Sequence, residues 1–410
     1  MKSVLSMRLS DLTEQKRPIT YGVVKPGPEQ NDGVLFVRGG DIFAGRIALD
    51  VLRTITPEVS AQYKRTLIRG GELLISLVGN PGEVAIAPES LAGANIARQV
   101  GLIALRPEIN TQYVMYYLMS PQGRAGLFAQ TGGAVQQVIN LADLKRVVMP
   151  LPSRFYQNRV TNILSSYDDL IDTNRRRILL LEESARLLFR EWFVYFKFPN
   201  HEKVKIVDRG GRKMPAEWEY LPFTKIKLFK KAPLGVPVFT NIRQYCQTSE
   251  IDGTSITGNG EEVDYENRPS RADIAPRINT IYFAKMKDTD KVLYFNKGNS
   301  DLLEKILLST GMVGFTTDEK YLGFLFGLLT SYEFVQYKNN FATGATQVSL
   351  NDASLKKIKV LFPVLNLVEL YSEVVNRLLE ECSYLRSQNQ KLAQARDLLL
   401  PRLMSGAIEV

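Results

Sequence analysis

TGGAVQQVINLADLKRVVMPLP, at residues 131–152, and ATGATQVSLNDASLKKIKVLFP, at residues 342–363, are two versions of one pattern. Each begins with a Gly/Thr-rich turn that carries glutamine. Each ends with Leu-Lys, a further Lys or Arg, and an apolar strand closed by proline. A single match of this kind can arise by chance, whereas several matches in the same order indicate a tandem duplication.

Three further pairs of segments match in the same order along the chain. The turn at Gly45 in VLFVRGGDIFAGRI corresponds to the turn at Gly253 in VFTNIRQYCQTSEIDGTSI, and the stretch from Ser60 corresponds to the stretch from Ser270. The helix-like residues 113–128 correspond to residues 321–337. The separation between matched landmarks stays between 208 and 212 residues, which predicts a duplicated globular domain.

Each copy mixes short alternating strands, such as VLFVR, ELLISLVG and TIYFAKM, with one or two helices. This mixture predicts an α+β fold for both copies, and the 410-residue length fits two or three domains. We expect the globular copies at residues 1–153 and 200–363, and long helical segments at residues 154–199 and 364–410.

Apolar residues recur at alternating steps of three and four in both helical segments. This 3.5-residue period predicts two long helices that pair as an antiparallel coiled coil, although two ordinary core helices remain an alternative. Each seam contains one asparagine, a residue that can fix the register, and Pro401 should end or kink the second helix. The predicted seam consists of Leu164, Tyr167, Ile171, Asn174, Ile178, Leu181, Leu188, Leu378, Cys382, Leu385, Asn389, Leu392 and Leu399.

Charge and composition favour a polyanionic partner in a reducing compartment. The formal net charge is +9 and the isoelectric point is near 9.3. The chain has one histidine, His201, which argues against a His-rich metal site. It has two cysteines, Cys246 and Cys382, which argue against a disulfide framework. No apolar run approaches the ~18–20 residues of a membrane helix, and the N-terminus lacks a signal-like apolar segment. We therefore expect a cytoplasmic protein.

The sequence lacks the motifs of the common catalytic classes. It has no phosphate-binding loop of the Gly-x-x-x-x-Gly-Lys-Ser/Thr type, no His-Glu-x-x-His, no Cys-x-x-Cys and no Gly-x-Ser-x-Gly. The strings closest to a DNA methyltransferase tetrapeptide, GNPGE and FATGA, lack the required residues. We therefore predict a binding protein without catalytic residues, metal or cofactor of its own.

Over essentially its whole length the chain resembles the DNA-specificity subunit of type I restriction–modification enzymes. The resemblance rests on the repeat, on TGGAVQQ and TGATQ followed by LKRVVMPLP and LKKIKVLFP, on ILSSYDDLIDTNRRRILLLEESARLLFREWF, and on MPAEWEY, which opens the second copy. The first copy begins MRLSDLTEQ instead of the MPxxW opening.

The resemblance implies two target-recognition domains that each read one half of a split, asymmetric target in double-stranded DNA. The helices would space the domains and dock two methyltransferase subunits, which bind S-adenosylmethionine. Restriction and translocase subunits, which use ATP and Mg²⁺, would join for defence against foreign DNA.

Phosphate contacts should come from Lys and Arg, and base contacts from Arg, Asn, Gln and other polar side chains. Because the copies differ between matched landmarks, we expect them to read different half-sites. The predicted DNA-binding residues are Arg38, Arg46, Lys64, Arg65, Asn95, Arg98, Gln99, Gln136 and Gln137 in the first copy, and Asn241, Arg243, Gln244, Tyr245, Arg268, Arg271, Lys285, Lys287 and Gln347 in the second.

Two other functions remain open at this point. The chain could be the recognition part of a split DNA-modification enzyme with cryptic catalysis, although it lacks the Asn-Pro-Pro tetrapeptide. It could also be a coiled-coil adaptor whose basic faces bind proteins, in which case its affinity would be nearly insensitive to salt.

Overall fold

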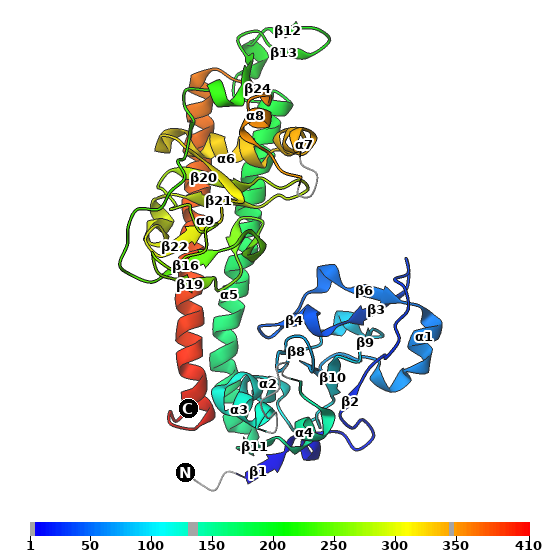
Figure 1. Ribbon diagram of the computed structural model, residues 1–410. Helices are drawn as coiled ribbons and strands as arrows, with labels where there is room; N and C mark the ends of the chain where they lie inside the picture. Colours follow the sequence, from blue (N-terminus) through cyan, green and yellow to red (C-terminus); the bar gives the residue numbers. More distant parts are fainter. Residues whose placement is uncertain (1–4, 130–137, 344–347) are drawn as a thin grey trace. The chain divides into compact units, whose positions relative to one another are not determined.

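The computed structural model describes residues 5–129, 138–343 and 348–410 (Figure 1). These residues form two compact units. The first unit extends to Leu170 and includes Leu392–Val410, and the second consists of Ile171–Lys391. Each unit contains strands, short helices and a segment of each of two long helices, α5 (Arg154–Phe189) and α9 (Leu365–Met404). The predicted α+β class with two long helices is confirmed.

The first unit is built on short sheets. An antiparallel sheet has the order β2-β10-β7-β8, and a three-stranded sheet has the order β6-β3-β9, in which β3 and β9 are parallel. Strand β1 pairs with β11, and β4 forms a hairpin with β5. The strands are β1 (Leu5–Arg8), β2 (Thr20–Tyr21), β3 (Val34–Val37), β4 (Ile42–Phe43), β5 (Arg46–Ile47), β6 (Arg53–Ile55), β7 (Leu73–Ser76), β8 (Val84–Ile86), β9 (Asn95–Ile96), β10 (Val100–Ile103) and β11 (Val148–Leu151), and the short helices are α1 (Pro57–Gln62), α2 (Thr111–Met119), α3 (Pro121–Phe128) and α4 (Leu141–Arg146).

The second unit repeats this topology. Its antiparallel sheet has the order β15-β23-β20-β21, and its three-stranded sheet has the order β19-β16-β22, again with one parallel pair. Strand β14 pairs with β24, β17 with β18, and β12 with β13. The strands are β12 (Ile206–Asp208), β13 (Lys213–Pro215), β14 (Glu219–Pro222), β15 (Lys230–Lys231), β16 (Arg243–Cys246), β17 (Ile251–Asp252), β18 (Ser255–Ile256), β19 (Glu261–Val263), β20 (Thr280–Ala284), β21 (Val292–Phe295), β22 (Ile306–Leu308), β23 (Met312–Thr316) and β24 (Lys359–Phe362), and the short helices are α6 (Leu322–Thr330), α7 (Tyr332–Phe341) and α8 (Asp352–Leu355).

The shared strand orders support the duplication, but two predicted landmark pairs need correction. Ser60 lies in α1, whereas Ser270 lies in a loop, because residues 264–279 of the second unit contain no helix. Gly45 and Gly253 both lie in the turn of a short hairpin, but Gly45 is the second turn residue and Gly253 the first. Sequence separation alone does not reveal a helix that replaces a loop of equal length, or a one-residue shift.

The segments of α5 and α9 run antiparallel within each unit. In the second unit Asn389 Nδ2 donates to the Ile171 carbonyl, and the Tyr371 hydroxyl donates to the Ala185 carbonyl. Residue numbers therefore rise along α5 where they fall along α9. In the first unit Arg396 contacts Asp168 and Tyr156 contacts Leu403, in the same sense. The predicted antiparallel pairing is therefore confirmed.

All the predicted seam residues are buried or half-buried. Leu164, Ile171, Asn174, Ile178, Cys382 and Leu385 are buried, and Tyr167, Leu181, Leu188, Leu378, Asn389, Leu392 and Leu399 are half-buried. The two seam asparagines meet, with Asn174 Nδ2 2.9 Å from Asn389 Oδ1. Helix α9 continues through Pro401 to Met404, so of the two expected effects of Pro401 the end of the helix is wrong. Pro401 lies in the last turn, where its missing N–H deprives only the Asp397 carbonyl of a partner.

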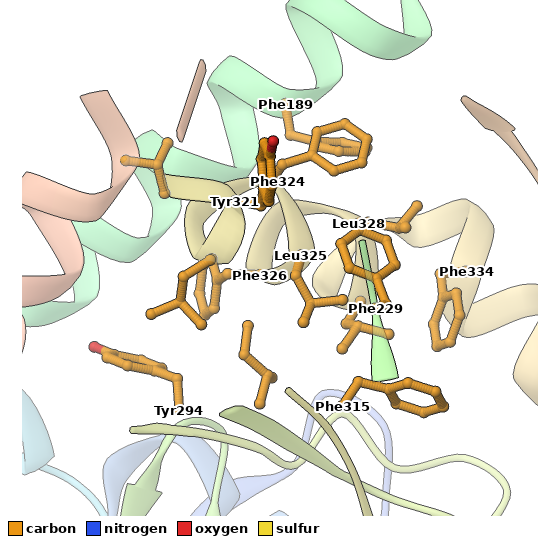
Figure 2. Packing of buried hydrophobic residues seen from close by; sticks show 14 of the residues in the cluster. Phe189, Phe229, Tyr294, Phe315, Tyr321, Phe324, Leu325, Phe326, Leu328 and Phe334 are labelled. Carbon is orange, nitrogen blue, oxygen red and sulfur yellow. The ribbon is translucent and has the colours of Figure 1, made fainter. Parts of the chain in front are cut away.

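Helix α6 forms the centre of the aromatic core of the second unit. Its sequence LGFLFGLLT is apolar on all sides, and Figure 2 shows Phe324 near Phe189 of α5 and Phe326 near Tyr294 of the sheet. Glycine permits the close approach to α5 and α9. A Cβ on Gly327 would lie 2.5 Å from the Phe189 ring and 2.6 Å from the Tyr371 hydroxyl. Within the described residues, no helix combines the length and apolar character needed to cross a bilayer.

Candidate nucleic-acid interface

In the first unit, Arg38 is held by a neighbouring carboxylate. Its Nη2 lies 2.7 Å and its Nε 3.1 Å from the two carboxylate oxygens of Asp41, and these bonds keep the pKa of Arg38 above its ordinary value. Gln247 occupies the matching place in the second unit, where Glu250 accepts its backbone N–H. The carboxylate cancels much of the Arg38 charge and fixes the direction of the guanidinium, which suits geometry-dependent recognition better than general attraction to phosphate.

Asn95 is excluded as a DNA contact by its burial. Its side chain is fully buried, its Oδ1 accepts a 2.6 Å bond from Thr66 Oγ1, and its Nδ2 donates to Ser60 Oγ at 3.2 Å. The Asn95 amide thus connects β9 by hydrogen bonds to α1 and to the 3₁₀ turn Lys64–Thr66. The neighbouring residues Arg98 and Gln99 are exposed and keep their place among the candidates.

Tyr245 is also excluded, because only 4% of it is exposed and it packs in a core cluster with Val236 and Phe239. The two residues before it on β16, Arg243 and Gln244, are half-buried. The guanidinium of Arg243 lies 4.4 Å from the centre of the Phe239 ring, and burial lowers the pKa of Arg243. Gln244 Nε2 donates to Glu262 Oε1 at 3.3 Å. Arg243 and Gln244 are therefore partly accessible on β16, whereas Tyr245 is buried.

The other candidates of the second unit differ in how far their charge is compensated. Arg268 stacks 4.4 Å from the Tyr265 ring centre and lies 3.6 Å from Asp273. Burial and the neighbouring Lys231 lower the pKa of Lys285. The remaining candidates are exposed: Arg271, Lys287 and Asn241, whose Nδ2 donates to the Glu304 carbonyl. The structure therefore distributes these residues over several loops and strands of the unit and does not gather them at one point.

Three predicted glutamines, Gln136, Gln137 and Gln347, lie outside the described residues. Arg46 is half-buried on β5, at the position that Ser255 occupies in the second unit. The described parts of the chain contain no cluster of three or more His, Cys, Asp or Glu side chains arranged to hold a metal ion.

A concave basic surface in the first unit brings two predicted residues together with three that the sequence analysis missed. Lys64 and Arg65 line a hollow of about 360 Å³ with Lys16, Arg69 and Lys145. We call these five residues the cationic groove. The three missed residues come from the loop before β2, the approach to β7, and α4, so they are distant in sequence and no local motif joins them.

Comparison with known proteins is consistent with this architecture. Residues 6–183 match the family model described as type I restriction modification DNA specificity domain. The EcoBI specificity subunit of Escherichia coli is 34% identical over 170 residues, an alignment that covers 40% of this chain and 35% of that protein. This chain therefore matches about a third of the length of that relative.

Two further likenesses extend over nearly the whole chain. The HindI specificity subunit of Haemophilus influenzae is 21% identical over 92% of this chain and 94% of its own length. The crystal structure of the type I restriction–modification S subunit from M. genitalium superposes with a TM-score of 0.50 at 16% identity, covering 98% of this chain and 97% of that one. At this low sequence identity, the likeness supports a shared fold and nothing more. In sequence and in fold, the chain is therefore similar to type I restriction–modification DNA-specificity subunits.

Proposed function

We propose that this chain recognises a bipartite, asymmetric sequence in double-stranded DNA, with one half-site read by each unit. The observation that carries the proposal is a duplicated fold whose matched surface positions carry different side chains. Arg38 corresponds to Gln247, and Arg46 corresponds to Ser255. Different polar groups at the same place on the same scaffold favour different base edges.

We further propose that the chain directs partner subunits to this target and performs no catalysis itself. Two methyltransferase subunits would bind S-adenosylmethionine and modify the DNA, and restriction and translocase subunits would use ATP and Mg²⁺. The helices α5 and α9 contribute residues to both units, which makes them suited to setting the distance between half-sites.

Methylome sequencing of a host that expresses this chain with its methyltransferase subunit tests the proposal. We expect one methylated motif with two constant blocks separated by a gap of fixed length. A contiguous motif, or no motif, would refute bipartite recognition. Adenosylmethionine-dependent methylation or DNA cleavage by the purified chain alone would instead support cryptic catalysis.

A helix insertion tests the spacing role. Four residues inserted next to Arg176 add about one turn, or about 6 Å, to α5. We expect the gap to change or binding to be lost, with each constant block unaltered. An unchanged gap with undiminished affinity would show that the helices do not set the spacing. An affinity that barely responds to salt would favour the protein-binding adaptor.

A further inference from the structure

The cationic groove has a floor that is electrically compensated and rigid. Arg17 Nη1 lies 2.7 Å from Glu72 Oε1, and Arg17 Nη2 donates to the Leu67 carbonyl at 3.2 Å. The same carboxylate accepts the backbone N–H groups of Arg69 and Gly70, each at 2.9 Å. Both members of the ion pair are largely buried, with exposed fractions of 11% and 3%. The pair therefore holds the loop before β2 against the approach to β7 and does not itself offer a free charge.

The five cations above this floor form no ion pair with any acidic side chain that the structure describes. Across the described residues, no ion pair involves Lys16, Lys64, Arg65, Arg69 or Lys145. Lys16, Lys64, Arg65 and Arg69 are exposed, and Lys145 is half-buried. Like charges gathered around one hollow repel each other and raise the local potential, so they favour a multiply charged anion.

The second unit closes the corresponding place with an ion pair. Ile19, just before β2, and Leu141, at the start of α4, both line the hollow, and by sheet register and helix start they correspond to Lys231 on β15 and Asp352 at the start of α8. Lys231 Nζ lies 2.5 Å from Asp352 Oδ1, and this contact lowers the pKa of Asp352. The second unit keeps an exposed lysine, Lys356, at the place of Lys145. It lacks α1 and the 3₁₀ turn that carries Lys64 and Arg65, because its residues 264–279 form a loop without helix.

We propose that the cationic groove binds the phosphodiester backbone of duplex DNA beside the half-site read by the first unit, and that the second unit makes no equivalent contact. This inference rests on the proposed function. The groove supplies affinity that is independent of sequence, so the backbone contacts on the bound DNA are unequal on the two sides. Lysine side chains act as point charges and suit phosphate oxygens without selecting a base.

The test compares two variants that lose the same charge. Lys16→Gln/Lys64→Gln/Arg65→Gln removes three exposed cations of the groove, and Lys203→Gln/Lys205→Gln/Lys213→Gln removes three exposed lysines elsewhere on the chain. Each is assembled with the methyltransferase subunit. Binding to a duplex that carries the methylome-defined target is measured by fluorescence anisotropy between 50 and 200 mM salt.

We expect the groove variant to lower the slope of log affinity against log salt by about 2–3, since each neutralised phosphate contributes about 0.9. Its methylated motif should stay unchanged, and the control variant should keep the wild-type slope. Ethylation interference should identify phosphates whose ethylation weakens binding of the wild type but not of the groove variant. These phosphates should lie on one side of the target only.

Three results would overturn the inference. If the groove variant keeps the wild-type slope while the wild type binds its target, the groove contacts no backbone and the proposed function stands. If the variant changes the bases of one constant block, the groove reads sequence. If the wild type binds no specific DNA, the proposed function fails together with the inference.

Discussion

Replacing Arg386 by methionine should destabilise the second unit by about 3–5 kcal/mol, because it removes the nearest counter-ion of a buried carboxylate. Arg386 Nη2 lies 2.5 Å from Glu182 Oε1, so α9 and α5 are joined by this pair. The Thr254 hydroxyl, in the turn between β17 and β18, donates to Glu182 at 2.7 Å, and the Tyr294 hydroxyl on β21 contacts Glu182 at 3.2 Å. Glu182 is only 2% exposed.

The magnitude follows from what remains after the substitution. The carboxylate of Glu182 keeps the two hydroxyl groups and a distant Arg186 at 3.7 Å, which do not offset the loss of a charged donor in a buried site. For a unit of about this size, each kcal/mol lowers the unfolding temperature by roughly 2–4 °C. We therefore expect a decrease of about 6–20 °C.

Tryptophan fluorescence provides the assay, because the chain has two tryptophans and both, Trp192 and Trp218, are buried in the second unit. Thermal and urea unfolding followed at these residues therefore report this unit.

A matched control replaces the whole network by apolar groups of similar shape, as Glu182→Leu/Arg386→Met/Thr254→Val/Tyr294→Phe. Since such replacements are often neutral or stabilising, this variant should unfold near the wild-type midpoint. If the free energy of unfolding of Arg386→Met is within about 1 kcal/mol of the wild-type value, the reasoning is refuted. Such a result would mean that water or a rearranged side chain compensates the charge of Glu182.

Three other perturbations have defined outcomes. Tyr116→Phe removes the hydroxyl that donates to Asp168, and should cost the first unit about 1.5–3 kcal/mol in calorimetric unfolding; a shift of the tryptophan-detected transition instead would contradict this. Gly327→Ala should cost the second unit about 1–3 kcal/mol by fluorescence, because its Cβ would meet Phe189 and Tyr371, and wild-type stability would disprove that close approach. Burial raises the pKa of Cys246 and Cys382 from 9.0 to about 11, so the folded state keeps protons that the unfolded chain has released. The contribution of these thiols to the stability of the second unit should therefore fall as the pH rises from about 9 to 11. Urea unfolding at pH 8 and 10.5 should show a smaller decrease for Cys246→Ala/Cys382→Ala than for the wild type, and equal decreases would rule the effect out.

The sequence predicted the long helices and their pairing because a periodic seam is a local property. A step of three and four residues places Ile171, Asn174 and Ile178 on one helix face regardless of the rest of the chain. Charge and residue type were less informative about the DNA-contact candidates. Asn95 and Tyr245 have suitable chemistry for bases, yet one fastens α1 to β9 and the other packs in a core cluster.

Alignment of the two copies by residue separation found the order of the elements and missed a local change. Helix α1 and the turn after it occupy almost the same number of residues as the loop that replaces them, so the separation between landmarks hardly changes. Hydrogen bonds distinguish the two cases, because Asn95 binds Ser60 and Thr66, whereas Ser270 lies in a loop.

By itself the sequence determined the duplication, the α+β character of each copy, the two paired helices and the resemblance to DNA-specificity subunits. These features follow from patterns that are read along the chain. Only the tertiary structure decided which polar residues are buried, that Arg386 meets Glu182, and that five cations from separate segments surround one hollow. Such contacts join residues that are far apart in sequence, and their free energy depends on burial and distance, which no local pattern specifies.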